Sequence, residues 1–160
     1  MYIFITGVAG FLGSNLADFY LKKGFTVSGC DNLIGGDLDN LDKKVNFHKT
    51  DCEDLEKMKE ITKNIDVVIH LVAVTHNQID EGKSMAEVFK EVNVEITKIL
   101  CKAIKKSSVK RLIYLSSIKA NGDTTMPGCS FSELSPTIPE DQAGVTKLEA
   151  EKTIKNLFNN

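Results

Sequence analysis

Short apolar runs alternate with longer amphipathic stretches along almost the whole chain. The apolar runs are typical of strands buried on both faces of a parallel sheet, and they span residues 2–5, 26–30, 45–49, 66–71 and 111–116. Apolar spacings of three and four predict helices over residues 11–23, 53–63, 84–107 and 141–158. Residues 118–139 form a long irregular stretch that holds all three prolines. This alternation predicts an α/β fold with a doubly wound parallel sheet.

The most informative segment directly follows the first apolar run. Residues 6–13 are Thr-Gly-Val-Ala-Gly-Phe-Leu-Gly, so glycines stand at positions 7, 10 and 13 just before a predicted helix. Gly7 permits a tight turn, Gly10 lets backbone N–H groups approach a diphosphate, and Gly13 allows close helix–strand packing. The spacing is G-x-x-G-x-x-G and not the G-x-G-x-x-G fingerprint, so a plain turn remains the alternative to a phosphate-binding loop.

An acidic residue stands at the end of the second predicted strand. Asp31 follows Gly7 by 24 residues, and a carboxylate at this place accepts hydrogen bonds from the 2′- and 3′-hydroxyls of a ribose. The same carboxylate would repel a 2′-phosphate, and no Arg or Lys lies between Asp31 and Lys43. The pattern favours NAD over NADP. An ordinary loop carboxylate is the alternative.

Ligands of doubly wound sheets bind outside the carboxyl ends of the strands. The residues that follow the predicted strands therefore share one edge of the sheet, and they are Gly7, Asp31, Asp51, Leu71 and Ser117. Each of these residues is ordinary when taken alone. Their common edge is the reason to predict a binding site there.

The composition is that of a globular protein. The chain has 160 residues, of which 42% are hydrophobic and 26% charged, which suits one domain. A net charge of −2 with interspersed signs gives no reason to expect nucleic acid or a membrane surface as a partner. No apolar run approaches the roughly 20 residues of a membrane span, and no signal-peptide pattern opens the chain. We expect a cytoplasmic protein.

The cysteines and histidines do not form a metal-binding pattern. The four cysteines are scattered without a C-x-x-C pair, which favours buried free thiols over disulfides or a zinc site. The three histidines show no ligand spacing either. We therefore expect no metal.

Several motifs follow one another in an order typical of one enzyme family. After T-G-V-A-G-F-L-G these motifs are Asp31-Asn32, Asp51-Cys52, His70-Leu71-Val72-Ala73, Val92-Asn93 and the Leu-Ser-Ser-Ile-Lys-Ala-Asn-Gly of residues 115–122. On them the chain resembles the NAD-dependent nucleotide-sugar epimerase/dehydratase branch of the extended short-chain dehydrogenase/reductase superfamily, to which the UDP-glucose 4-epimerases belong. The resemblance implies a Rossmann fold that binds NAD. It implies these cofactor-binding residues: Gly7, Gly10, Phe11, Leu12, Gly13, Asp31, Asn32, Asp51, Cys52, Leu71, Val72, Ala73, Asn93 and Lys147.

The same resemblance implies an active site in which one member is missing. In this family a Ser, a Tyr and a Lys act together, and the Tyr takes the proton of a sugar hydroxyl while hydride passes to NAD. Ser117 and Lys147 match the Ser and the Lys, but the Tyr position, four residues before Lys147, is Ala143. Alanine has no titratable proton, and loss of a positioned acid/base group costs about 10² to 10⁴ in rate. We expect the chain to be nearly inactive.

Members of this family are also longer than this chain. They continue with a further strand and a C-terminal domain that holds the nucleotide-sugar, so we expect residues 1–160 to be an NAD-binding domain truncated before both. The family often dimerises, which makes a homodimer an expected arrangement. Three functions stay open: the NAD-binding half of a nucleotide-sugar epimerase, dehydratase or dehydrogenase; a non-catalytic NAD-binding module; and a reductase of steroid or phenolic substrates.

Structural roles compete with the functional ones at several positions. Asp51 is a candidate cap for the helix predicted to begin near residue 53, and His70 is better explained as a structural histidine than as a base. Asn93 lies within an apolar helical face and is expected to be a buried amide that bonds backbone. Ser117 has the alternative of a polar strand end, and Lys147 that of a solvated charge.

Overall fold

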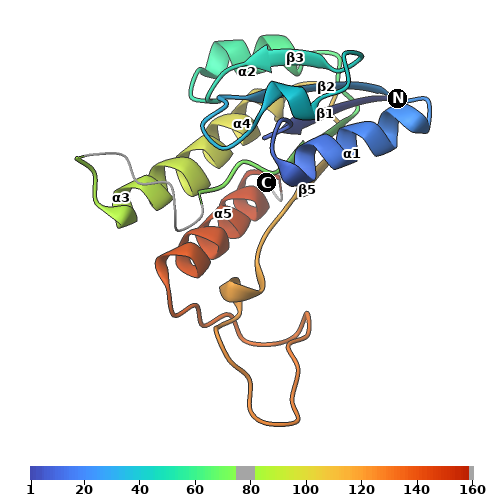
Figure 1. The fold of residues 1–160 in the computed structure, drawn as a ribbon. Helices are drawn as coiled ribbons and strands as arrows, with labels where there is room; N and C mark the ends of the chain where they lie inside the picture. Colours follow the sequence, from blue (N-terminus) through green and yellow to red (C-terminus); the bar gives the residue numbers. More distant parts are fainter. Residues whose placement is uncertain (75–81, 159–160) are drawn as a thin grey trace. The chain divides into compact units, whose positions relative to one another are not determined.

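The computed structural model describes residues 1–74 and 82–158, and its strands and helices alternate as the hydrophobic pattern predicts (Figure 1). In chain order the elements are β1 Tyr2–Thr6, α1 Phe11–Lys22, β2 Thr26–Asp31, the 3-10 turn η1 Leu38–Asn40, β3 Asn46–Lys49, α2 Leu55–Ile61, β4 Val67–His70, α3 Met85–Lys90, the π-helical turn η2 Glu91–Glu95, α4 Ile96–Ile104, β5 Arg111–Tyr114, the 3-10 turn η3 Ile118–Ala120 and α5 Gln142–Phe158.

The chain divides into two compact units. The first, which we name the sheet unit, comprises Met1–Val72 and Ile99–Leu115. The second, the helical unit, comprises Ala73–Lys98 and Ser116–Asn160. All five strands belong to the sheet unit, whereas α3, η2, η3 and α5 belong to the helical unit.

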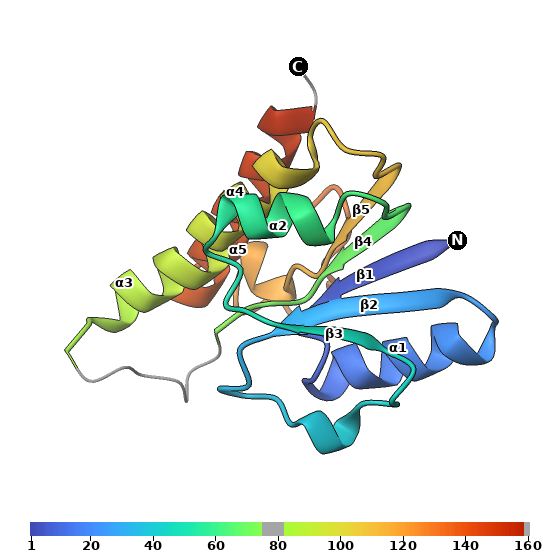
Figure 2. The ribbon, with the colours of Figure 1, turned by 90° about the horizontal axis from the view of Figure 1, so that it is seen from above.

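The sheet has five parallel strands in the order β3-β2-β1-β4-β5, which confirms the predicted doubly wound arrangement (Figure 2). The central strand β1 pairs with β2 on one side and with β4 on the other, so that Ile5 stands opposite Gly29 and Ile69. The chain therefore proceeds from β1 toward one edge of the sheet and later from β4 toward the other. The switch point between β1 and β4 is where sheets of this kind open a crevice for a ligand.

Apolar side chains on both faces explain why the strands are almost continuously hydrophobic. Ile3 and Ile5 of β1 pack with Ala17 of α1 in one buried cluster, while Phe4, between them, is fully buried on the opposite face. Figure 2 shows α1 on one side of the sheet and α2 on the other. The central strand β1 is therefore buried on both faces, as its nearly continuous apolar run predicts.

The long helix predicted over residues 84–107 is interrupted. It begins at a capping box formed by Ser84 and Glu87, and it contains a π-helical turn, η2, before it continues as α4. Asn93 belongs to η2, and its backbone carbonyl accepts a hydrogen bond from Thr97 Oγ1 at 2.7 Å. A π turn adds one residue to a helical turn, which rotates Asn93 relative to a regular helix; such turns are frequent at functional sites. Hydrophobic spacing does not reveal this insertion.

The helix after β3 begins later than predicted, at Leu55, and its cap is not Asp51. The Asp54 carboxylate accepts hydrogen bonds from the backbone N–H groups of Glu56 and Lys57 at 2.9 and 3.0 Å. Asp51 lies three positions earlier and is exposed. The proposed capping role of Asp51 is therefore wrong, because Asp54 already fills it.

Between β5 and α5, the irregular stretch of residues 118–139 contains the single 3-10 turn η3 at its start, as its three prolines predict. In the described part of the chain, no helix combines the length and the apolar character that crossing a membrane requires.

Candidate functional site

The glycine loop that joins β1 to α1 has the geometry expected from its sequence. Gly7 adopts φ +70°, which permits the turn, and the N–H groups of Gly7 and Val8 donate to the Cys30 carbonyl at 2.8 and 3.2 Å. A Cβ on Gly13 would lie 2.1 Å from the Gly7 carbonyl oxygen. Gly13 is therefore required for α1 to approach the loop so closely.

The N-terminus of α1 carries no side-chain cap. Gly10 is the N-cap residue, and among residues 1–74 and 82–158 no side-chain hydrogen bond caps this end of the helix, while Phe11 and Leu12 are 82% and 48% exposed. A Cβ on Gly10 would meet only the Gly7 carbonyl oxygen, at 3.4 Å, so the protein's own packing does not demand glycine there. The partial positive charge of a helix N-terminus and its free amides suit the oxygens of a diphosphate.

Asp31 ties the end of β2 to the glycine loop. Its buried carboxylate accepts hydrogen bonds from the N–H of Ala9 at 3.0 Å and of Leu33 at 2.8 Å. A carboxylate has about four acceptor sites, and these two bonds use two of them. The neighbouring Asn32 is exposed, and its side-chain oxygen accepts from the Ile34 N–H at 3.0 Å. Asp31 is thus held in place while it keeps acceptor capacity for ribose hydroxyls.

Asp51 and Cys52 follow β3 at the same edge of the sheet. Asp51 is exposed, whereas Cys52 is buried and adopts φ +68°, a value that side chains other than glycine rarely take. The N–H of Cys52 donates to Thr50 Oγ1 at 3.3 Å, which supports this turn.

A threonine missed in the sequence analysis anchors the end of β4. Thr6 Oγ1 accepts hydrogen bonds from the N–H groups of Leu71 and Val72 at 3.1 and 3.4 Å and lies 2.7 Å from His70 Nδ1. His70 is fully buried and also packs against the tilted ring of Tyr114 at 5.7 Å between ring centroids, so it has the structural role expected of it. Thr6 directly precedes the glycine loop, and that position was the available signal. It fixes Leu71 and Val72 beside Gly7.

In the helical unit, Asn93 links two segments through its amide. Its Oδ1 accepts from the Val74 N–H at 3.0 Å and its Nδ2 donates to Thr146 Oγ1 at 3.0 Å. Asn93 is 1% exposed, which confirms the predicted buried amide that bonds backbone. Ala73, a predicted cofactor contact, directly precedes Val74 and is half-buried.

The segment bearing Ser117 and the helix bearing Lys147 pack tightly in the helical unit. A Cβ on Gly144 would lie 2.3 Å from the Lys119 carbonyl oxygen, so glycine is needed where α5 meets η3. Ser117 is the N-cap of η3, and its Oγ accepts from the Lys119 N–H at 3.3 Å. This close packing, which the sequence analysis missed, positions both predicted catalytic residues. Ser117, considered above as a polar residue at a strand end, therefore has a structural role as the cap of η3.

The side chain at position 143 is apolar, and so are the residues around it. Ala143 packs against the buried cluster of Val74, Val88 and Phe89. One helical turn later, Lys147 is 9% exposed, so the alternative of a solvated charge is wrong. Burial lowers the pKa of Lys147 to about 8, and the charge of Glu151 raises it in part. An ammonium with a reduced pKa thus lies beside a position without a proton donor.

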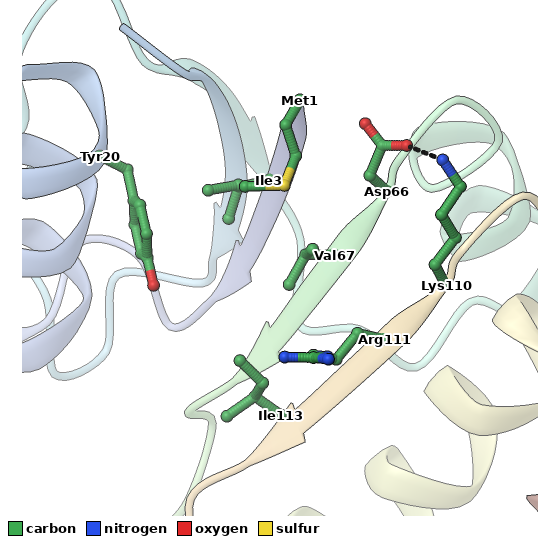
Figure 3. A pocket seen from close by; sticks show the side chains of 8 residues that line it. All are labelled: Met1, Ile3, Tyr20, Asp66, Val67, Lys110, Arg111 and Ile113. Carbon is green, nitrogen blue, oxygen red and sulfur yellow. Dashed lines mark hydrogen bonds and ion pairs between the residues drawn. The ribbon is translucent and has the colours of Figure 1, made fainter. Parts of the chain in front are cut away.

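The structure also has a pocket at the opposite edge of the sheet. Its lining includes Tyr20 of α1, Ile3 of β1, Val67 of β4 and Arg111 of β5, and an ion pair between Asp66 and Lys110 at 3.0 Å borders it (Figure 3). These residues lie toward the amino ends of the strands, whereas a coenzyme of this sheet type binds at the carboxyl ends. The pocket is therefore separate from the predicted site. Among the described residues, no cluster of His, Cys, Asp and Glu is arranged to hold a metal ion.

Comparison with known proteins identifies relatives along the whole chain. The profile of the NAD dependent epimerase/dehydratase family matches residues 3–159. The chain is 35% identical to a UDP-glucose 4-epimerase of Vibrio cholerae over 154 residues, which are 95% of this chain and 45% of that protein. It is 36% identical over 133 residues to a dTDP-D-glucose 4,6-dehydratase of Dictyostelium discoideum, covering 75% of this chain and 30% of that one.

Solved structures of epimerases also have the fold of this chain. A UDP-glucose 4-epimerase from Thermotoga maritima, solved with UDP-glucose, superposes with a TM-score of 0.89 at 26% identity and covers 100% of this chain and 52% of its own. A UDP-glucuronic acid 4-epimerase from Bacillus cereus, in complex with NAD, superposes with a TM-score of 0.83 at 27% identity. The match covers 100% of this chain and 53% of the epimerase. The chain thus spans about half the length of the relatives it matches. On its glycine loop, its parallel sheet and these matches, the chain belongs to the NAD-dependent epimerase/dehydratase family.

Proposed function

We propose that this chain is the NAD-binding half of a nucleotide-sugar epimerase or dehydratase and binds NAD without oxidising a sugar. The observation that carries the proposal is the Asp31 carboxylate, which accepts the Ala9 N–H at 3.0 Å. One carboxylate thereby joins the loop suited to a diphosphate to the strand end suited to a ribose. A single side chain therefore ties together the two segments that would hold the diphosphate and the ribose of a dinucleotide.

The residues present fit NAD. The space beside Gly10 and the uncapped first turn of α1, Phe11 to Gly13, would hold the diphosphate, and Asp31 with Asn32 would hold the adenosine ribose. Asp51 and Cys52 would contact the adenine, as in the family. Leu71, Val72, Ala73, Asn93 and Lys147 complete the proposed set. Bound NAD would supply a hydride acceptor.

The charge at the ribose position supports NAD over NADP. Asp31 is buried at 7% exposure, and no cationic residue lies between it and Lys43. Placing a phosphate beside a buried carboxylate without a compensating cation is unfavourable.

Ala143 decides the catalytic part of the proposal. Ser117 supplies a hydroxyl that can hold a reacting oxygen, and Lys147 supplies a charge, but Ala143 can neither accept nor donate a proton. A sugar hydroxyl bound there would lose its proton slowly. The substrate-binding part belongs, in this proposal, to the half of the relatives that lies beyond the matched region.

A non-catalytic NAD-binding module is the second candidate, and Ala143 favours it. In that case NAD occupancy would stabilise the chain or regulate a partner, with no sugar involved. To separate the two, Ala143→Tyr is introduced into this chain extended by the C-terminal part of a relative. Sugar-dependent reduction of NAD supports the enzyme ancestry, whereas tight NAD binding without turnover supports the module.

Calorimetric titration tests cofactor binding directly. We expect NAD to bind much more tightly than NADP, and Asp31→Ala to weaken NAD binding by about tenfold or more, because hydrogen bonds to a charged acceptor are lost. Asp31→Asn keeps the shape of the side chain and one acceptor oxygen but removes the charge. Its NAD affinity therefore separates the effect of the charge from an effect on folding. Asp42→Ala, an exposed carboxylate in the same unit, is the matched control. Equal affinity for both cofactors would contradict the ribose assignment.

A further inference from the structure

Two thiols that are distant in the sequence meet behind the proposed adenosine site. The sulfur atoms of Cys30 and Cys52 lie 3.2 Å apart, and both side chains are buried, at 0% and 1% exposure. Both residues belong to the sheet unit. The other two cysteines are Cys101, which is buried in α4, and Cys129, which is exposed. Among the described residues, Cys30 and Cys52 are the cysteines whose sulfur atoms are in contact.

Both cysteines are directly connected to residues of the proposed site. Cys30 precedes Asp31, and its carbonyl accepts the N–H groups of Gly7 and Val8 at 2.8 and 3.2 Å. Cys52 follows Asp51 and is held at φ +68°. A change in the distance between these sulfurs therefore moves the backbone that carries the glycine loop on one side and the Asp51 turn on the other.

We propose that Cys30 and Cys52 form a reversible intramolecular disulfide that weakens dinucleotide binding. The inference rests on the proposed function for its effect on NAD, and on the sulfur geometry alone for the bond itself.

The two cysteines differ in how they can be reached. Cys30 lies inside β2, where it is paired in register with Thr6 of β1 and His48 of β3. Cys52 lies in the irregular segment between β3 and α2, outside the strands of the sheet. The hydrogen bond with Cys52 and burial both raise the pKa of Cys30 well above its ordinary value, which keeps Cys30 a thiol at neutral pH. Cys52 is therefore the first thiol to react.

The oxidant is a small-molecule disulfide of the glutathione class. The Cys52 thiolate attacks one of its sulfurs, which breaks that S–S bond, forms a mixed disulfide and releases one small thiol. The Cys30 thiol then gives up its proton as its sulfur attacks the Cys52 sulfur, which forms the Cys30–Cys52 bond and releases the second small thiol, protonated by that proton. Two protein thiols lose two electrons and two protons, and the small disulfide gains both.

Closure of the bond changes the proposed site because the sulfurs must come closer. A disulfide requires a separation of about 2 Å, which is shorter than the 3.2 Å contact. The Asp51–Cys52 turn and the end of β2 are then drawn together, which disturbs the Asp31 bond to Ala9. By thermodynamic linkage, bound NAD must disfavour the disulfide by the same factor by which the disulfide weakens NAD.

The test is oxidation of the full chain by oxidised glutathione in a Cys129→Ala background, which removes the exposed thiol. Peptide mass spectrometry without reductant should find the Cys30–Cys52 disulfide, and dithiothreitol should reverse it. Amide hydrogen exchange of residues 7–13 should rise severalfold on oxidation, and the dissociation constant for NAD should rise by about fivefold or more. In Cys52→Ala, which lacks the thiol that reacts first, oxidant should change neither exchange nor affinity, while Cys101→Ala should respond to oxidant like the parent. In Cys30→Ala, mass spectrometry should find a glutathione mixed disulfide on Cys52 and no intramolecular bond.

Two results would overturn the proposal. One is failure to find the Cys30–Cys52 bond after oxidation of the folded chain, with both thiols still alkylated once it is unfolded. The other is a disulfide that leaves amide exchange of residues 7–13 unchanged. If the reduced chain does not bind NAD, the proposed function is contradicted, whereas disulfide mapping and amide exchange still decide this inference.

Discussion

The proposed cofactor end of the sheet unit and the predicted catalytic segments of the helical unit share two packing features but differ in the chemical groups they present. In each, a glycine permits backbone contact that a Cβ would prevent: Gly13 against Gly7, and Gly144 against Lys119. In each, one buried polar side chain ties two segments together, Asp31 in the first and Asn93 in the second. The packing that positions functional groups is therefore present in both units.

The difference lies in what the packing presents. The sheet unit presents an uncapped helix N-terminus and a carboxylate, which are the groups that the proposed NAD site needs. The helical unit presents Ser117 and Lys147 but has Ala143, packed against Val74 and Phe89, at the remaining position. A methyl group at position 143 fits an apolar neighbourhood without an unpaired polar atom. Under the proposed function, the scaffold is thus separable from proton transfer, because the packing at position 143 does not need a side chain that carries a proton.

The strongest way to break this comparison is to fill the glycine contact in the sheet unit. Gly13→Ala should destabilise the chain by about 3 kcal/mol or more, because its Cβ would lie 2.1 Å from the Gly7 carbonyl oxygen and the backbone must move. Urea unfolding followed by circular dichroism measures the loss.

Gly10→Ala is the matched control for Gly13→Ala. Its Cβ would be 3.4 Å from the same carbonyl oxygen, so stability should change by less than about 1 kcal/mol. We expect its NAD affinity to fall nonetheless, because the methyl group would occupy diphosphate space. Equal destabilisation by the two substitutions would contradict the distinction between a packing glycine and a ligand glycine.

The corresponding change in the helical unit removes its buried amide. Asn93→Ala should cost about 2–3 kcal/mol, because it leaves the Val74 N–H without its acceptor and Thr146 Oγ1 without its donor. Asn15→Ala, which removes an exposed amide bond to the Phe11 carbonyl, should cost less than about 0.5 kcal/mol. Similar losses for the two variants would show that the Asn93 network is not a structural link.

Lys147 gives the smallest expected effect and a distinctive pH dependence. Burial lowers the pKa of Lys147 from 10.5 to about 8 in the folded chain, so folding disfavours its charged form. Between about pH 8 and 10.5 the unfolded chain binds the extra proton, and stability rises with pH. Lys147→Met should therefore be more stable than the parent by about 2 kcal/mol at pH 7, with the difference shrinking through this window. A difference that is independent of pH would contradict a buried ammonium at this position.

How much of the site was predictable depends on whether its determinants are local. The turn at Gly7, the packing role of Gly13 and the buried amide of Asn93 follow from short patterns, because each is set by nearby backbone conformation or by a helical face. The cap at Asp54 was missed, although it is also local, because Asp51 and Asp54 are chemically equivalent candidates. Helix boundaries of this kind depend on one or two residues of backbone geometry.

Long-range contacts were outside the reach of any local pattern. The Thr6 bonds to Leu71 and Val72 join segments 65 and 66 positions apart. The meeting of Cys30 with Cys52 joins segments 22 positions apart, and nothing in their spacing distinguishes them from Cys101. The π turn at η2 adds a residue within a helix whose apolar face still looks continuous.

Alternation of apolar runs, glycine spacing and the carboxylate at Asp31 were sufficient to establish the parallel sheet and the edge at which a dinucleotide is expected. They suffice because each follows from backbone sterics and hydrophobic periodicity within one βα unit. The partners of Thr6, Asn93 and the paired thiols, and the burial of Lys147, emerge only once distant segments are packed together. Packing places those groups in a low-dielectric interior. Burial there strengthens their hydrogen bonds and shifts the pKa of Lys147.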